Sequence, residues 1–172
     1  FSWAGIFCII GSGAIMNPQQ TIALANAIEQ LGIPVYLSGM ARGLLGKDNP
    51  LQLRHNRKEA LREADLILLA GVPCDFRLDY GRHLNSSAIH IAINRSAEDL
   101  TKNKKPDLAI LADPGECLID LAQLNPVKPD AVKNWLASLH TRDAGRETDI
   151  YQRAQQEVEG INPLQLFKHL ET

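Results

Sequence analysis

The stretch Asp-Leu-Ile-Leu-Leu-Ala-Gly-Val-Pro-Cys-Asp-Phe-Arg, residues 65–77, decides the fold. Its apolar part, residues 66–70, is unbroken, which predicts a strand buried on both faces of a parallel sheet. Residues 71–73, Gly-Val-Pro, end that strand, because glycine and proline do not prolong a central strand. Asp75 and Arg77 follow directly, and open parallel sheets bind ligands just beyond the carboxyl ends of their strands. The stretch therefore predicts a central strand and, after it, a polar loop at the ligand edge.

Further apolar runs predict the rest of the sheet. Four of them have strand length, namely residues 6–10, 34–37, 88–93 and 108–113. Helical patterns fall between them, at residues 17–31, 57–63 and 114–122, whereas residues 44–53 have a loop composition and residues 78–85 indicate an irregular segment or a short helix. Strands that alternate with helices predict an α/β fold, here a three-layer, doubly wound, parallel, Rossmann-like sheet.

The character of the chain changes after residue 124. Residues 129–139 have the pattern of an amphipathic helix, residues 142–159 are polar and helical, and another helix begins near residue 161. These segments hold too few apolar residues to form a core of their own. We therefore expect a domain over residues 1–124, a helical linker over residues 125–172, and a further domain beyond it in a longer protein.

Bulk properties exclude several classes of function. A net charge of −2 gives no electrostatic reason to expect nucleic acid or an anionic membrane surface as a partner. The apolar opening, residues 1–10, is too short to span a bilayer. The cysteines Cys8, Cys74 and Cys117 form no C-x-x-C motif, so neither a disulfide framework nor a zinc site is indicated. A cytoplasmic location is the default expectation.

A glycine turn follows the first predicted strand. Residues 11–13, Gly-Ser-Gly, are half of a dinucleotide-binding fingerprint, but Met16 stands where the full motif needs a small residue. The second strand ends at Leu37-Ser38, without the acidic residue that holds a ribose. Ordinary NAD(P) binding is therefore disfavoured. Two interpretations stay open for this turn: contact with a phosphate through backbone N–H groups, or tight packing that needs small residues.

An arginine follows each of three predicted strands: Arg42, Arg77 and Arg95. A guanidinium at such a place can hold a pyrophosphate or a carboxylate through paired hydrogen bonds. Alternatively, each arginine pairs with a nearby acid such as Asp75 or Asp79. The repetition at three strand ends favours an anionic ligand.

Two aspartates lie at strand ends as well. Asp75 and Asp113 can accept hydrogen bonds from a ribose or an adenine, or they can cap the helices that follow. The histidines show no metal-binding spacing, and His90, in the middle of a strand, is expected to be a satisfied structural histidine. Cys74 has no histidine that can be placed beside it. The sequence therefore predicts no catalytic residue and no metal ligand, and it indicates a binding scaffold.

Several motifs together resemble a known family. Residues 39–46 (Gly-Met-Ala-Arg-Gly-Leu-Leu-Gly), 48–51 (Asp-Asn-Pro-Leu), 64–71 (Ala-Asp-Leu-Ile-Leu-Leu-Ala-Gly) and 75–77 (Asp-Phe-Arg) resemble the central domain of thiamine-diphosphate-dependent enzymes. The likeness covers about residues 5–124. It points to the acetolactate synthase-like branch and to the 2-hydroxyacyl-CoA lyase and oxalyl-CoA decarboxylase branches.

The resemblance implies a parent enzyme of three α/β domains that breaks or forms a C–C bond beside a carbonyl. Its pyrimidine- and diphosphate-binding domains flank the central one and hold thiamine diphosphate and Mg²⁺, and the whole is a homo-oligomer, a dimer or tetramer. The central domain holds FAD in acetolactate synthase-like members, ADP in oxalyl-CoA decarboxylase-like members, and nothing in others. The Gly-Asp-Gly motif with its downstream Asn is absent from this sequence, so this part is not expected to catalyse the reaction by itself.

The resemblance also implies site residues. The cofactor-binding positions carried over are Gly11, Gly13, Met40, Arg42, Gly43, Gly71, Val72, Asp75, Asn94, Arg95 and Asp113. Arg77 is a candidate for contact with the substrate channel. Departures from the family pattern lie at residues 73–74, where Pro-Cys replaces Arg-Phe, and at residues 76 and 94–95, where acids that FAD-binding members carry are lost. Two alternatives from other classes stay open: a stand-alone nucleotide-binding module, and a purely structural domain with an empty cleft.

Overall fold

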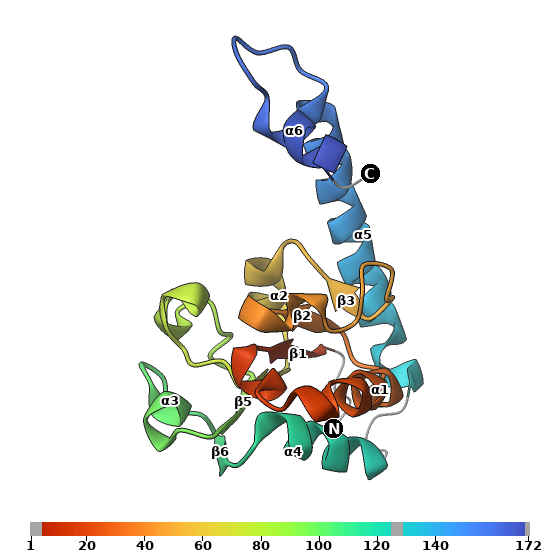
Figure 1. Cartoon of the computed structure of the whole chain (residues 1–172). Helices are drawn as coiled ribbons and strands as arrows, with labels where there is room; N and C mark the ends of the chain where they lie inside the picture. The colour runs from red at the N-terminus through yellow and green to blue at the C-terminus, as the bar shows by residue number, and fades with distance from the viewer. Residues whose placement is uncertain (1–4, 125–128, 171–172) are drawn as a thin grey trace.

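The computed structural model describes residues 5–124 and 129–170. One six-stranded, all-parallel sheet forms its centre, with the strand order β3-β2-β1-β4-β5-β6 (Figure 1). The strands are β1 (Ile6–Ile10), β2 (Val35–Leu37), β3 (Gln52–Leu53), β4 (Leu66–Ala70), β5 (Ile89–Asn94) and β6 (Leu108–Leu111). The predicted doubly wound, Rossmann-like α/β class is confirmed, and each of the five predicted strands is present.

The helices cover both faces of this sheet. They are α1 (Thr21–Leu31), α2 (Arg57–Glu63), α3 (Ala97–Thr101), α4 (Pro114–Gln123), α5 (Pro129–Ala154) and α6 (Pro163–Leu170). Short 3₁₀ turns add η1 (Ser12–Ile15), η2 (Pro18–Gln20), η3 (Gly39–Gly43) and η4 (Phe76–Gly81). The predicted helix start at residue 17 is confirmed, since the Asn17 side chain accepts a hydrogen bond from the Gln19 N–H, although the first turn is 3₁₀.

Two short elements, β3 and α3, were absent from the sequence prediction. Residues 44–53 were expected to be a loop, but Gln52 and Leu53 form β3 and pair with Val35 and Tyr36 of β2. A two-residue strand is too short to show periodicity, so its pairing partner alone defines it. The short helix α3 was not predicted. Its N-cap is Ser96, whose hydroxyl accepts a hydrogen bond from the Asp99 N–H.

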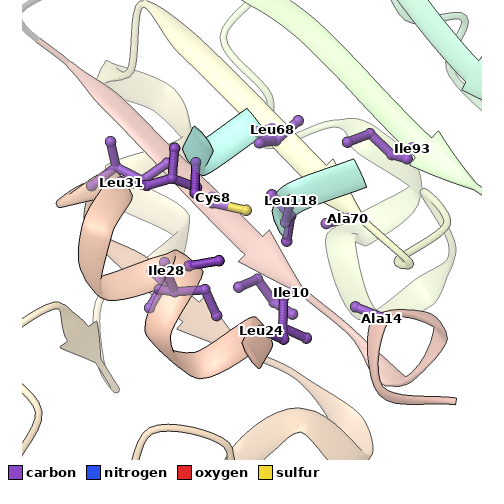
Figure 2. Close-up of a cluster of buried hydrophobic side chains, with 14 of the residues drawn as sticks. Cys8, Ile10, Ala14, Leu24, Ile28, Leu31, Leu68, Ala70, Ile93 and Leu118 are labelled. Atoms are coloured by element: carbon purple, nitrogen blue, oxygen red, sulfur yellow. The ribbon is translucent and has the colours of Figure 1, made fainter. Parts of the chain in front are cut away.

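The sheet separates two apolar layers. On one face α1 and α4 pack against β1 and β4, and Figure 2 shows this cluster, which includes Cys8, Ile10, Leu24, Ile28, Leu31, Leu68 and Leu118. On the other face α2 covers a second cluster, which includes Phe7, Ile9, Ala60, Leu61, Ile67 and Leu69. Successive side chains of a strand point to opposite faces, so a strand covered on both sides must be apolar throughout. This is the physical reason for the unbroken runs in β1 and β4.

Helix α5 crosses the β3 edge of the sheet. Val132, near its start, is buried in the first cluster, whereas Leu139, two turns later, is buried in the second. Beyond the sheet the helix continues outward, and α6 lies against its far end (Figure 1). The first part of the predicted linker therefore packs on the domain. The proposed domain boundary itself falls at residues 125–128, which lie outside the described residues, and it stays a prediction.

None of the helices in the described part of the chain is long and apolar enough to cross a membrane. The cytoplasmic location that cysteine usage suggested stays a prediction.

His90 is a buried histidine without hydrogen-bonded ring nitrogens. It lies in β5 with 4% of its surface exposed, and neither Nδ1 nor Nε2 has a partner among the described residues. Burial, and to a smaller extent the charge of Lys104, lower the pKa of its imidazole to about 4. The structural role expected from the sequence holds, but the expectation that the ring is satisfied is wrong.

We expect His90→Met to raise the free energy of unfolding by about 1–2 kcal/mol at pH 7, because it removes two unpaired buried polar atoms. The imidazole's pKa is lower in the folded state than in the unfolded chain, so protonation favours unfolding. The unsubstituted protein should lose up to about 3 kcal/mol as the pH falls from about 6.5 to 4, and the variant should not lose this contribution. Urea unfolding at pH 7.5 and 5.5 measures both. A stability difference that does not widen at pH 5.5 would contradict the burial of a neutral imidazole.

Candidate ligand site at the carboxyl edge of the sheet

The predicted site residues lie on loops at one edge of the sheet. Because all strands are parallel, the loops after β1, β2, β4, β5 and β6 emerge at their common carboxyl edge. The chain leaves β1 towards β2 on one side, whereas β4 leads to β5 on the other, so the topological switch point lies between β1 and β4. Ligands of doubly wound folds bind in the crevice at such a point.

In this protein, backbone atoms close that crevice. The Gly11 N–H donates to the Ala70 carbonyl at 2.9 Å, and the Gly13 N–H donates to the Gly71 carbonyl at 3.3 Å. A Cβ atom added to Gly11 would lie 2.3 Å from Val72 Cγ2. The glycines therefore allow two loops to touch, and their N–H groups are already bonded within the protein. This geometry accounts for Gly11, Gly13 and Gly71 without a ligand, so their part in cofactor binding stays a prediction.

Arg77 is paired with Asp75 in the loop after β4. Its Nε donates to both carboxylate oxygens, at 3.1 and 3.0 Å, and its backbone N–H donates to Asp75 Oδ1 at 2.9 Å. The Arg77 guanidinium holds the pKa of the Asp75 carboxyl below its usual range. The pair is part of the loop's own structure, with the Arg77 side chain 42% exposed. Contact of Arg77 with a substrate channel stays a prediction.

The predicted residues after β5 and β6 also have partners in the protein. Arg95 pairs with Asp113, whose carboxylate caps α4 by accepting from the Gly115 N–H at 2.8 Å. Asn94 is buried, and its Oδ1 accepts from the Ser96 N–H at 3.2 Å. Pairing with a nearby acid, the alternative considered for the arginines, is therefore what the structure shows for Arg77 and Arg95.

Arg42 is the exception among the three arginines. It lies exposed in η3, where the structure gives it no carboxylate partner among residues 5–124 and 129–170. Met40, from the same turn, is 63% exposed, and its N–H donates to Ser12 Oγ at 3.1 Å. Of the predicted cationic residues, Arg42 is thus the one available to an anion.

A pocket of about 910 Å³ lies beside Arg42, on the β2–β3 side of the sheet. We call it the basic pocket. Its lining is Tyr36, Leu37, Arg42, Gly43, Gly46, Lys47, Gln52, Leu53, Arg54, His55, Asn56 and Arg57. This lining contains three arginines, a lysine and a histidine, and it contains no aspartate or glutamate. Only Arg42 and Gly43 of the predicted cofactor-binding set belong to it.

The arginines of the basic pocket have no carboxylate partner in the described part of the chain, whereas His55 Nε2 lies 2.7 Å from Glu147 Oε1. Arg57 is half-buried, and burial together with the charge of Arg42 lowers the pKa of its guanidinium. The guanidinium groups donate to backbone carbonyls: Arg57 Nη2 donates to Arg77 O at 2.6 Å, and Arg54 Nη2 donates to Lys47 O at 2.7 Å. Guanidinium groups so placed keep free N–H donors and a common positive field. They suit a bidentate anion such as a phosphate or diphosphate.

Sequence reasoning missed Lys47, Arg54, His55 and Arg57. Residues 54–57, Arg-His-Asn-Arg, directly follow β3, so they stand at a strand end like the other candidates. The run would have been found had the apolar Leu53 before it been recognised as part of a strand. Elsewhere in the described part of the chain, no group of His, Cys, Asp or Glu side chains is arranged to hold a metal ion.

Comparison with known protein families gives one match over most of the domain. Residues 6–121 match the family described as "Thiamine pyrophosphate enzyme, central domain".

Individual curated proteins show the same relationship. The chain is 41% identical over 170 residues to 2-hydroxyacyl-CoA lyase 2 of Caenorhabditis elegans, an alignment that covers 95% of this chain and 27% of that protein. It is 39% identical over 171 residues to the Homo sapiens protein of the same name, covering 95% and 26%. It is 34% identical over 121 residues to the acetolactate synthase large subunit IlvG of Mycobacterium tuberculosis, covering 70% and 22%. The chain thus spans about a quarter of the length of these relatives.

Among solved structures, the thiamine diphosphate-dependent 4-hydroxybenzoylformate decarboxylase of Rhodococcus jostii RHA1 is similar. The TM-score is 0.54 at 20% sequence identity, and the match covers 72% of this chain and 25% of that one. At this identity the likeness supports the fold alone.

Proposed function

The chain belongs to the thiamine pyrophosphate enzymes, whose central domain it contains, and on that premise we propose that the whole protein is a C–C lyase that acts on 2-hydroxyacyl-CoA. The support is the extent of similarity. The 2-hydroxyacyl-CoA lyase 2 of C. elegans aligns with 95% of this chain, an extent that includes α5, whereas the acetolactate synthase of M. tuberculosis aligns with 70%. An acetolactate synthase-like activity is the second candidate.

The share of this domain in such an enzyme is architecture and ligand binding. Thiamine diphosphate supplies the ylid chemistry, and it would be held with Mg²⁺ by the flanking pyrimidine- and diphosphate-binding domains. The titratable residues at the carboxyl edge, Asp75 and Asp113, are occupied in an ion pair and a helix cap. The parent chain would act as a dimer or tetramer in which these domains meet.

We further propose that the basic pocket binds the diphosphate of an adenine nucleotide, with ADP as the expected ligand. The observation that carries this proposal is a pocket of about 910 Å³ whose charged lining residues are all basic. Backbone contacts close the crevice at the β1–β4 switch point, whereas the basic pocket lies on the β2–β3 side of the edge. The ADP part of coenzyme A has the same chemistry, so the substrate itself is a second source of this group.

Isothermal titration of the purified protein with ADP, coenzyme A and FAD tests this proposal. We expect ADP to bind, and its affinity should fall as salt is raised, because the attraction is between exposed charges. Tighter binding of coenzyme A than of ADP would identify the substrate as the source. Tighter binding of FAD would favour the acetolactate synthase-like reading, and binding of none of the three would favour the structural domain with an empty cleft.

The activity is tested separately on the whole protein. Loaded with thiamine diphosphate and Mg²⁺, it should consume a 2-hydroxyacyl-CoA, which chromatography of the CoA esters measures. Consumption of pyruvate with no loss of the CoA ester would instead support the synthase.

A further inference from the structure

Helix α5 holds one wall of the basic pocket from outside. The wall is residues 54–57, which we call the basic wall. Asp143 of α5 accepts two backbone hydrogen bonds from it, from the Arg54 N–H to Oδ2 at 2.9 Å and from the His55 N–H to Oδ1 at 2.8 Å. Asp143 is not among the residues that line the pocket. Its carboxylate therefore contacts the wall without lining the pocket.

Further contacts join α5 to the chain around these two hydrogen bonds. Asn56 Nδ2 donates to the Arg142 carbonyl at 3.1 Å, and His55 Nε2 lies 2.7 Å from Glu147 Oε1. On the other side of β3, His140 Nε2 lies 2.6 Å from the Pro50 carbonyl oxygen. The helix thus grips the chain both before and after β3.

The basic wall has little local structure to fix it. The strand before it, β3, has two residues, and Asn56 has a φ of 55°, in the left-handed region that a non-glycine residue adopts at a cost. Within the sheet side, the Tyr36 hydroxyl donates to the His55 carbonyl at 2.9 Å. The backbone of Arg54 and His55 is therefore held between the Tyr36 hydroxyl on the sheet and the Asp143 carboxylate on α5. Arginine side chains that share a ligand would otherwise move apart by mutual repulsion.

We propose that Asp143 is a positioning residue for the basic pocket: by fixing the backbone at Arg54 and His55 it sets the arrangement of cations that binds the diphosphate. This inference rests on the proposed ADP site. It implies that ligand affinity depends on a helix that does not touch the ligand. By linkage, a bound ligand also stabilises the seating of α5 on the domain.

The direction in which ADP affinity changes distinguishes a positioning role of Asp143 from a purely electrostatic effect of its charge. Asp143 carries a negative charge beside a basic pocket, so the loss of that charge alone would tighten the binding of an anion. The loss of positioning would weaken it. We expect Asp143→Ala to weaken ADP binding about tenfold. Asp143→Asn keeps one acceptor oxygen for the two N–H groups and should fall between Asp143→Ala and the unsubstituted protein.

Asp149→Ala is the matched control. Asp149 lies on the same helix and pairs with Arg146 and Arg153, so its substitution removes an equal charge from α5 without touching the basic wall. Its ADP affinity should stay within about twofold of the unsubstituted protein, since additive effects are expected at distant sites. Thermal melts show that each variant is folded under the conditions of the titration.

The experiment combines ADP titration with hydrogen exchange of the amides of residues 54–57. Faster exchange and weaker binding in Asp143→Ala, with Asp143→Asn in between, support the inference. Unchanged or tighter binding in both Asp143 variants, while the unsubstituted protein binds ADP, overturns it and leaves the pocket standing. Failure of the unsubstituted protein to bind ADP overturns the proposed site and, with it, the inference.

Discussion

Gly71→Ala is expected to lower the free energy of unfolding by about 3–5 kcal/mol, since left-handed strain and overpacking act together. Gly71 has a φ of +69°, and a Cβ there would lie 2.6 Å from the Ala14 nitrogen and 2.8 Å from Gly13 Cα. These are backbone atoms of the turn after β1, so no side-chain rotation relieves the contact. The two loops at the switch point would have to separate. Urea unfolding followed by circular dichroism measures the loss.

Gly145→Ala is the matched control for this change. Gly145 lies inside α5, where an added Cβ meets no atom within 4 Å. Alanine at an interior helix position should raise the free energy of unfolding by about 0.5–1 kcal/mol. Equal stability of Gly71→Ala and the unsubstituted protein would mean that the loops are not in contact. The crevice between β1 and β4 would then become the better ligand site.

The sequence predicted the centre of the fold because burial on both faces leaves a simple pattern. The runs that became β1 and β4 are apolar at every position, and the proline and glycine residues that follow them mark the strand ends. The resemblance drawn from residues 39–46, 48–51, 64–71 and 75–77 is confirmed by the match over residues 6–121. What the pattern could not show was β3, because two paired residues carry no period of their own.

The sequence prediction divided the long helix α5 into two for a different reason. Residues 129–139 and 142–159 were read as separate helical segments, whereas α5 runs continuously over Pro129–Ala154. The change from an amphipathic to a polar pattern after residue 139 led to this division. Contacts such as those of Asp143 with the basic wall hold the polar part of the helix on the domain.

The sequence predicted where the candidate site lies, but it did not predict which side chains pair with each other there. Parallel topology alone brings strand-end residues to one edge, which is why Arg42, Arg77 and Arg95 were noticed together. The sequence could not decide which of them has an acid beside it. Asp113 is 18 positions from Arg95, and Asp143 is about 90 positions from the wall that it holds. Such pairings depend on how the sheet and α5 are packed.

Arg42→Ala combined with Arg57→Ala is expected to weaken ADP binding by about a hundredfold or more, if each charged hydrogen bond contributes about 1.5–3 kcal/mol. Each single substitution should weaken binding by about tenfold. Arg57→Lys keeps the positive charge but loses the forked geometry, so we expect its ADP affinity to lie between those of the unsubstituted protein and Arg57→Ala. Isothermal titration at constant ionic strength measures all four variants.

Arg82→Ala is the control for this series. The Arg82 side chain is 74% exposed, pairs with Asp79 and does not line the basic pocket. Its removal should leave ADP affinity unchanged at low salt. Equal weakening by Arg82→Ala and Arg42→Ala would indicate a general charge effect, and unchanged binding in the double variant would exclude the pocket.

The melting temperature of Arg42→Ala, measured with and without ADP, tests the role of Arg42 in a second way. In the unliganded protein the charge of Arg42 acts unfavourably on Arg57, which is one cause of the lowered pKa of that guanidinium. Removing Arg42 relieves this repulsion, so without ligand Arg42→Ala should melt at the same temperature as the unsubstituted protein or slightly higher. With excess ADP at equal concentration the order should reverse, because a ligand stabilises the folded state more when its affinity is higher. If Arg42 served folding alone, its substitution would lower the melting temperature in both conditions. The reversal would therefore show that Arg42 and Arg57 lie close together in order to bind an anion.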